Sequence, residues 1–282
     1  MEIVRESAAM RARADEWHAE GKRIGFVPTM GAFHAGHLSL MRAARAECDA
    51  VVVSLFVNPT QFNDPSDLAA YPRTEDSDAA AARGERVDVL FAPAASDMYP
   101  VGAATTVSVS GLEDVLEGAV RGPQHFRGVA TVVARLLNVV APDVLYLGQK
   151  DAQQVAVIER MVADLAFPAR VVMCPTVREA DGLAMSSRNV RLGADRGRAL
   201  ALRRGLDAAL AAIARGERDA AAVAKAGRDA MTGMGVEPDY FAIVDAGTLA
   251  PLTRLGGQVL IAVAARVGPV RLIDNEIVRV SA

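Results

Sequence analysis

The first 176 residues carry the feature that most constrains the fold, because short, uninterrupted apolar runs alternate there with longer amphipathic segments. An uninterrupted apolar run predicts a strand that is buried on both faces, as in a parallel sheet. Strands separated by helix-length segments are typical of βαβ units, whose helices cover such a sheet. The predicted strands are Ile24–Thr29, Ala50–Val57, Val87–Ala92, Asp143–Leu147 and Val171–Cys174, and the predicted helices are His37–Glu47, Val129–Val140 and Ala152–Ala166.

The pattern changes after Cys174. The segment Ala194–Met231 is rich in Ala and Arg and has the spacing of two helices broken near Arg215–Arg218. Three more strands are predicted at Tyr240–Val244, Val259–Ala264 and Val270–Ile273, the last two antiparallel because a turn joins them. We therefore predict an α/β fold, with a Rossmann-like doubly wound parallel sheet in residues 1–176 and a smaller α+β domain, with helices and an antiparallel sheet, in residues 177–282.

Charge and composition exclude several classes of protein. The 31 Lys and Arg against 34 Asp and Glu give a net charge of -3, without the positive excess of a general nucleic-acid binder. No apolar stretch approaches the roughly 18 residues that a membrane span needs, and the charged N-terminus is unlike a secretory signal. Cys48 and Cys174 form no CxxC pair, which indicates a reducing compartment. We expect a cytoplasmic protein that binds neither nucleic acid nor membranes.

The segment Phe26–His37 is the most informative for function, because a predicted strand runs there into small residues and then into a helix. Ligands of open α/β sheets bind beyond the carboxyl ends of the strands. Gly31 and Gly36 allow the backbone to approach a ligand, and the first N–H groups of the helix suit a phosphate. His34 and His37 are three residues apart and so share a face, where they can donate to a phosphoryl group in transfer.

Other interpretations of the two histidines remain open at this point. Each can be a helix cap or a surface residue, and the HxxH spacing also occurs in zinc sites. Zinc needs a third and a fourth ligand, which neither Cys48 nor a nearby carboxylate obviously supplies. The short HxGH motif alone therefore indicates nucleotidyl transfer without proving it.

Polar residues follow two further predicted strands. Asn58 and Gln61 come directly after the second strand, where amides can bind the hydroxyl and carboxylate groups of a small molecule. For Asn58 taken alone, a simple turn is the more natural interpretation, whereas Gln61 is harder to explain in that way. In Gly148–Asp151, Lys150 provides a cation suited to a polyphosphate, and Gln154, four residues later, looks toward the same place. Asp151 alone can be a helix cap, and Lys150 with Asp151 a solvated ion pair.

The segment Arg178–Arg188 lies at the predicted domain boundary. It contains two serines and an arginine that could wrap phosphates and close over them as a lid. Its Ser, Gly and Asp content is also that of an ordinary linker. The residues alone do not separate these two interpretations.

These motifs together resemble the pantothenate synthetase (pantoate–β-alanine ligase) family of the HxGH nucleotidyltransferase superfamily. The resemblance covers nearly the whole chain and rests on six segments in order: Pro28–His37, Phe56–Phe62, Tyr71–Thr74, His125–Val129, Gly148–Asp151 and Met185–Arg188. It implies that ATP and (R)-pantoate form a pantoyl adenylate and pyrophosphate, after which β-alanine displaces AMP to give pantothenate. It also implies Mg²⁺ bound mainly through the phosphates of ATP, a homodimer, a nucleotide- and pantoate-binding N-terminal domain and a C-terminal lid domain.

The resemblance assigns roles residue by residue. The ATP site it implies comprises Met30, Gly31, Ala32, Phe33, His34, Ala35, Gly36, His37, Gly148, Gln149, Lys150, Asp151, Val177, Met185, Ser186, Ser187 and Arg188. The catalytic groups it implies are His37 as proton donor, with His34, Lys150, Ser186, Ser187 and Arg188. It places pantoate on Gln61 and Gln154, and β-alanine near Gln61. Asn58, Tyr71, His125 and Arg127 are expected to complete the pocket walls.

Three departures from the family pattern qualify these roles. Position 149 is Gln where Glu is common, position 152 is Ala where an aromatic is usual, and Ser77 interrupts the acidic run of Glu75, Asp76 and Asp78. We therefore name no protein ligand for a metal. Two alternatives to the ligase are a different HxGH adenylyltransferase, which gives Gln61 and Gln154 no evident role, and a regulatory module that binds ATP without turnover.

Overall fold

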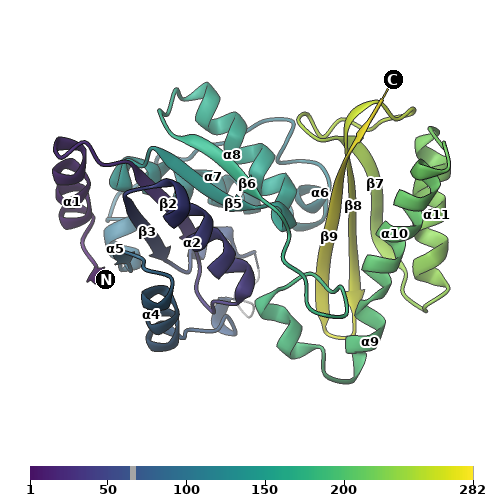
Figure 1. Cartoon of the computed structure of the whole chain (residues 1–282), viewed down its shortest axis with the longest axis horizontal. Coiled ribbons are helices and arrows are strands. Elements are labelled where there is room, and N and C mark those ends of the chain that lie inside the picture. Colours follow the sequence, from purple (N-terminus) through teal and green to yellow (C-terminus); the bar gives the residue numbers. More distant parts are fainter. Residues whose placement is uncertain (64–67, 282) are drawn as a thin grey trace. The chain divides into compact units, whose positions relative to one another are not determined.

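A computed structural model of the chain describes residues 1–63 and 68–281 (Figure 1). The chain divides into two compact units. The first comprises Met1–Asp114, Gly118–Gly148 and Val157–Pro175, and the second comprises Val115–Glu117, Gln149–Ala156 and Thr176–Ala282. Two short internal segments therefore group with the C-terminal residues, whereas the sequence suggests a single boundary near Val177.

The first unit contains a six-stranded parallel sheet of order β1-β4-β3-β2-β5-β6, which confirms the predicted doubly wound fold. From β2 the chain builds outward to β3 and β4 on one side and to β5 and β6 on the other. The strand order thus reverses between β2 and β5, the position where doubly wound sheets bind ligands. The strands are β1 (Glu2–Val4), β2 (Ile24–Thr29), β3 (Ala50–Leu55), β4 (Val89–Phe91), β5 (Val144–Gly148) and β6 (Arg170–Cys174).

Helices α2 and α4 share one hydrophobic cluster with the sheet, in which Met41 and Ala82 pack with strand residues such as Val27 and Val53. Helices α1 and α7 contact each other and β2. Before β6, the structure gives bounds for the helices α1 (Ser7–Ala19), α2 (Ala35–Glu47), α4 (Glu75–Gly84), α5 (Ala95–Met98), α6 (Glu117–Arg121), α7 (Gln124–Val140) and α8 (Ala152–Asp164).

The second unit contains an antiparallel sheet of order β7-β8-β9, with α10 and α11 along one face (Figure 1). Side chains on a strand alternate between faces. Val270 and Leu272 of β9 pack with the helices, whereas Arg271 and Asn275 lie on the other face. The elements are α9 (Arg196–Ala199), α10 (Ala201–Ala214), α11 (Ala220–Thr232), β7 (Pro238–Asp245), β8 (Gly257–Val267) and β9 (Val270–Val280).

The other face of β9 holds both short internal segments of the second unit. Arg271 forms an ion pair with Glu117 at 2.5 Å, and Asn275 bonds to the backbone that follows β5. The sequence predicts only Val270–Ile273 as a strand, because the polar residues from Asp274 to Glu276 interrupt the apolar pattern. The strand continues to Val280 since these polar side chains find partners within the unit.

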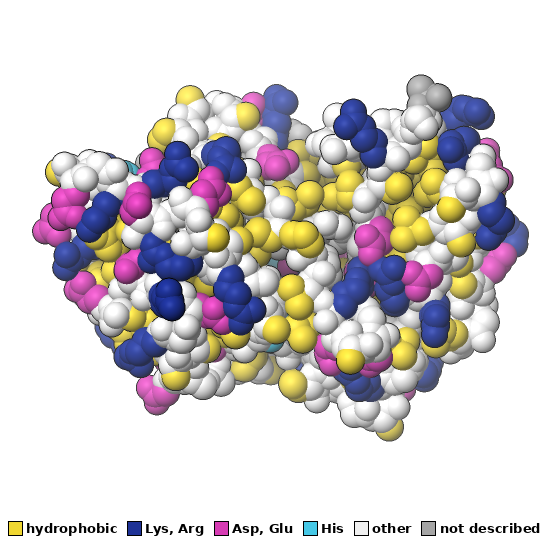
Figure 2. Space-filling view, in the orientation of Figure 1, with side chains coloured by type: hydrophobic (Ala, Val, Ile, Leu, Met, Phe, Trp, Pro, Cys, Tyr) yellow, Lys and Arg dark blue, Asp and Glu magenta, His cyan; other side chains and the backbone are white. Residues whose placement is uncertain are grey.

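No helix among residues 1–63 and 68–281 is both long and apolar enough to cross a membrane. Figure 2 shows basic side chains interspersed with acidic ones across the face that it draws. This mixture accords with the near-neutral net charge of -3.

Candidate active site

The turn between β2 and α2 lies at the carboxyl end of the central strand. Gly31 has φ +94° and Ala32 has φ 53°, so two consecutive residues adopt left-handed backbone. A Cβ on Gly31 would lie 2.6 Å from Leu55 Cδ1 and 3.0 Å from Asp78 Oδ2. Glycine is therefore required here both for its conformation and for its small size.

A buried carboxylate holds this turn in place. Asp78 of α4 is 2% exposed. Its oxygens accept the backbone N–H of Ala32 at 2.9 Å and that of Phe33 at 2.7 Å, and the hydroxyl of Thr74 at 3.0 Å. The sequence motifs predict no role for Asp78. Its position four residues before the apolar Ala82 nevertheless indicates that the two side chains share the inward face of a helix.

His34 and His37 form a capping box at the start of α2. His34 Nδ1 accepts the Gly36 N–H at 3.2 Å, and His37 Nδ1 accepts the His34 N–H at 3.3 Å. A neutral imidazole that accepts at Nδ1 carries its proton on Nε2. The ring centroids are 4.2 Å apart. The helix start therefore presents two neighbouring Nε2–H donors, beside the first backbone N–H groups of the helix.

Asn58 and Gln61 follow β3 and lie in and beside a 3-10 turn, Pro59–Gln61. Asn58 is 1% exposed, and its Nδ2 donates to Gln61 Oε1 at 3.0 Å and to the Gly128 carbonyl at 3.1 Å. Gln61 Nε2 lies 3.0 Å from Met30 Sδ. The structure thus joins the segment after β2 to the segment after β3, and Asn58 is both a turn residue and a support for Gln61.

Tyr99 supports the same network, a role that the sequence motifs do not predict. Its hydroxyl donates to Asn58 Oδ1 at 2.8 Å. Burial raises the pKa of Tyr99, so that the hydroxyl stays a neutral donor at working pH. No motif contains Tyr99, and its sequence separation from Asn58 hides the contact.

Helix α7 closes against the Pro59–Gln61 turn. His125 Nδ1 lies 2.8 Å from the Gln61 carbonyl oxygen. A Cβ on Gly128 would lie 2.6 Å from the Thr60 carbonyl oxygen, so the helix and the turn touch through this glycine. Arg127 pairs instead with Glu113, 3.8 Å away. Of the residues expected to complete the pocket walls, Asn58 and His125 therefore contact Gln61.

Tyr71 has a different neighbour. Its ring packs edge-on against Phe62, with the ring centroids 5.7 Å apart. Phe62 directly follows the Pro59–Gln61 turn. Tyr71 is therefore joined to the Gln61 turn through the ring of Phe62.

In the second unit, Gln149–Asp151 forms a 3-10 turn that leads into α8. The side chain of Lys150 is 22% exposed, and its Nζ lies 3.5 Å from Asp151 Oδ1, so the expected Lys–Asp pair is present. Gln149 Nε2 donates to Asn275 Oδ1 at 3.4 Å. An ionised glutamate, which is common in the family at this position, could not donate in this way. Gln154 is half-buried on α8.

The 178–188 segment is a built hairpin rather than an irregular linker. Arg178 and Ala184 form an antiparallel bridge. The Met185 N–H donates to the Val177 carbonyl at 3.0 Å, and Ser186 Oγ accepts the Arg188 N–H at 3.2 Å. These bonds set the backbone of the Met185–Arg188 stretch, where the half-buried Ser187 also lies.

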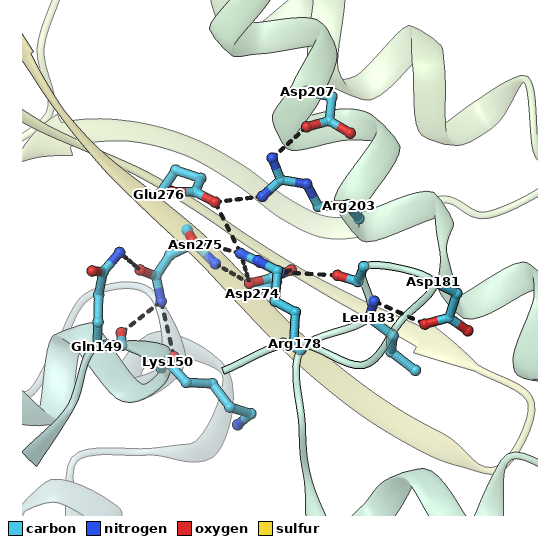
Figure 3. A network of polar contacts seen from close by, with 12 residues as sticks. Gln149, Lys150, Arg178, Asp181, Leu183, Arg203, Asp207, Asp274, Asn275 and Glu276 are labelled. Atoms are coloured by element: carbon cyan, nitrogen blue, oxygen red, sulfur yellow. Dashed lines mark hydrogen bonds and ion pairs between the residues drawn. The ribbon is translucent and has the colours of Figure 1, made fainter. Parts of the chain in front are cut away.

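Arg178 fixes this hairpin to β9 (Figure 3). Its guanidinium donates to both oxygens of Asp274, at 2.7 and 3.1 Å, and to Glu276 Oε1 at 3.0 Å. Asp274 is 3% exposed. Burial raises the pKa of Asp274, and the Arg178 guanidinium opposes that shift by stabilising the charged form. The pair therefore depends on both partners being present.

No cluster of three or more His, Cys, Asp or Glu side chains that could hold a metal ion occurs in residues 1–63 and 68–281. In the acidic run after Tyr71, Asp78 is engaged by the backbone of the turn and Glu75 by Arg5. These carboxylates have structural partners.

The family model described as "Pantoate-beta-alanine ligase" matches residues 2–277. The chain belongs to this family. A "Pantothenate synthetase" of Moorella thermoacetica is 51% identical over 283 residues, which covers 100% of both chains. As in that family, the protein is an enzyme that condenses pantoate with β-alanine at the expense of ATP.

Solved structures of the ligase family agree with this assignment. The pantothenate synthetase of Thermus thermophilus superimposes with a TM-score of 0.92 at 46% identity, covering 98% of this chain and 99% of that one. The ligase of Francisella tularensis, described as complexed with β-γ ATP and β-alanine, has a TM-score of 0.79 at 34% identity, covering 98% and 97%. Both likenesses extend through the two units.

Proposed function

We propose that the enzyme works in two steps through an acyl adenylate. The pantoate carboxylate attacks the α-phosphorus of ATP, an acyl–oxygen–phosphorus bond forms, and pyrophosphate leaves. The amine of β-alanine then attacks the acyl carbon, AMP leaves with the electron pair of the broken bond, and the amine loses a proton. The observation that carries this proposal is the pair of Nε2–H donors of His34 and His37 at the start of α2.

Charge is the main obstacle to the first step. A carboxylate is already ionised near neutral pH and needs no base. An anion must nevertheless approach a polyanion, so positioning and hydrogen-bond donors supply most of the catalysis. His37 acts as the proton donor to the phosphates, and His34, Lys150, Ser186, Ser187 and Arg188 contribute further donors.

The remaining roles follow the resemblance. We assign ATP binding to the residues that the family resemblance implies, Met30–His37, Gly148–Asp151, Val177 and Met185–Arg188. Gln61 and Gln154 bind pantoate, and Gln61 also contacts β-alanine. The bonds of Gln61 to Asn58 and His125 support this role, because they hold its backbone and side chain in one orientation. We assign nucleotide and pantoate binding to residues 1–176 and the lid role to residues 177–282, as the resemblance implies, although Val115–Glu117 and Gln149–Ala156 group with the second unit.

Mg²⁺ is proposed to bind mainly through the phosphates of ATP. Mg²⁺ commonly keeps several waters and binds substrate phosphates together with one or two carboxylates, so it needs no dedicated protein cage. When bound, it offsets the negative charge of the phosphates. We assign it no protein ligand.

The family resemblance supports a homodimer. Cys48 and Cys174 are both buried and free, the state expected in a reducing cytoplasm.

The products test the proposed reaction. Purified enzyme with ATP, pantoate and β-alanine should form AMP and pantothenate one for one, with pyrophosphate released when β-alanine is omitted. Formation of ADP and phosphate would overturn the adenylate route. Tight ATP binding with no pyrophosphate release would instead indicate a regulatory module.

Replacing Gln61 with Ala should raise the KM for pantoate while the KM for ATP stays nearly constant. A hydrogen bond to a charged group is worth about 1.5–3 kcal/mol, or roughly 10- to 100-fold in affinity. Steady-state kinetics with each substrate varied in turn measures the effect. Gln258→Ala, at an exposed position of β8, is the matched control. Wild-type pantoate kinetics for the Gln61 variant would remove this residue from the pocket.

Gly128→Ala should displace the turn that carries Gln61, because Gly128 packs directly against the backbone of this turn. Its Cβ would meet the Thr60 carbonyl oxygen at 2.6 Å and Gln61 Cα at 2.9 Å, and these backbone atoms must move. Overpacking of this kind costs about 1–3 kcal/mol of stability, and we expect the KM for pantoate to rise with it. Urea unfolding and kinetics test both effects. Gly84→Ala, with nothing within 4 Å, is the control, and equal behaviour of the two variants would contradict the close approach.

A further inference from the structure

Strand β9 holds the backbone on both sides of Lys150 through a single side chain. Asn275 Nδ2 donates to the Gln149 carbonyl at 2.9 Å and to the Lys150 carbonyl at 2.9 Å. Two carbonyl oxygens can be bonded only by the NH₂ group of the amide, so the orientation of Asn275 is unambiguous. Its remaining atom, Oδ1, accepts from Gln149 Nε2 at 3.4 Å.

These two bonds define the direction of the Lys150 side chain. The Gln149 carbonyl belongs to the peptide plane before the Lys150 Cα, and the Lys150 carbonyl belongs to the plane after it. Because each peptide unit is rigid, holding both planes sets φ and ψ of Lys150 and therefore the direction of its Cα–Cβ bond. In Figure 3 the Lys150 side chain points away from Asn275, so the amide acts on the lysine only through its backbone.

Asn275 is itself firmly held. It is 3% exposed and lies opposite Ala262 of β8 in the antiparallel ladder. Its backbone N–H donates to Asp274 Oδ1 at 2.8 Å. Asp274 in turn receives both bonds from Arg178. Adjacent residues of β9 thus hold the hairpin that carries Ser186–Arg188 and the turn that carries Lys150.

We propose that Asn275 is a positioning residue for Lys150, which sets the place of the lysine ammonium group for the transfer step. This inference rests on the proposed role of Lys150 at the phosphates of ATP. Asn275 lies outside all six segments on which the family resemblance rests. Lysine has a long, flexible stem, so a fixed Cα–Cβ direction is what the protein can control. Asn275 touches neither substrate nor reacting atoms.

The test is a double-mutant cycle between Asn275→Asp and Lys150→Ala. Aspartate keeps the shape but loses both donors and places a carboxylate against two carbonyl oxygens. Misplacement of a catalytic group by about 1 Å can cost on the order of 100-fold in rate, and we expect kcat to fall by about 10- to 100-fold with a smaller change in the KM for ATP. In the Lys150→Ala background the same substitution should change kcat by less than about twofold, because residues that act through one group are not additive.

Controls separate positioning from folding. Asn138→Asp makes the same chemical change where an exposed α7 amide donates to the Ala134 carbonyl, and it should leave turnover unchanged. Thermal unfolding of each variant corrects kcat for the folded fraction. If the aspartate variant does not fold, Asn275→Ala, which removes the donors without adding charge, enters the same cycle.

The outcomes distinguish the inference from the function on which it rests. Losses that multiply in the double variant would overturn the positioning role and leave Lys150 as proposed. A Lys150→Ala variant with wild-type kcat would overturn both. A cycle in which the Asn275 effect disappears without Lys150 supports the inference.

Discussion

His37→Asn should lower kcat by about 100-fold or more, which is the usual cost of removing one donor to developing charge in a transition state. The prediction follows from the tautomer that the capping box imposes. His37 Nδ1 accepts the His34 N–H at 3.3 Å, so Nε2 carries the proton that can reach a phosphate oxygen. Asparagine reaches only about as far as Nδ1, and therefore lacks a group at the position of Nε2.

A second substitution sharpens this experiment. Glutamine extends far enough to place an N–H donor near the position of Nε2, so His37→Gln should retain more turnover than His37→Asn. The Kd of ATP should change much less than kcat in both variants, because a donor to developing charge acts mainly in the transition state. Single-turnover release of pyrophosphate and equilibrium binding of ATP measure the two quantities.

The control is His18→Asn, a partly exposed histidine of α1 that lies 3.7 Å from Asp143. It should leave turnover at the wild-type level. If His37→Asn and His37→Gln weaken ATP binding as much as they lower turnover, His37 belongs to ground-state binding and the proton-donor role is wrong.

Local pattern in the sequence was enough to predict the sheet. Continuous apolar runs mark β2 and β3 because both strands are buried on both faces, and the expected Ile24–Thr29 matches β2 residue for residue. Helix α2 begins at Ala35, two residues before the predicted start at His37, because His34 provides the cap. Boundaries therefore depended on side-chain bonds that apolar spacing does not reveal.

Contacts between distant residues could not be predicted in the same way. Tyr99 supports Asn58 across 41 positions, and Asn275 holds Lys150 across 125. Such pairs join elements that only the tertiary fold brings together. The motif residues were recognisable because they end strands or begin helices, whereas their supports lie inside ordinary-looking segments.

The largest combined effect on stability and turnover is expected for Asp78→Ala. The carboxylate accepts the N–H groups of Ala32 and Phe33 beneath the turn that leads to His34. Its removal leaves two partly buried donors without an acceptor, at about 1–3 kcal/mol each. We expect a loss of roughly 2–6 kcal/mol in the free energy of unfolding by that same reckoning, measurable by urea denaturation.

Turnover should fall as well, because the two left-handed residues at Gly31 and Ala32 depend on an outside acceptor to stay in place. Asp78→Asn retains one accepting oxygen and should lose less of both quantities. Asp76→Ala removes an exposed acid from the same turn of α4 and should cost about 1 kcal/mol or less, the size of a helix-dipole effect. The contrary result is an Asp78→Ala variant that unfolds at the wild-type urea concentration and keeps the wild-type kcat/KM for ATP. In that case the turn is stable without the carboxylate, and Asp78 has no part in organising the phosphate-binding segment.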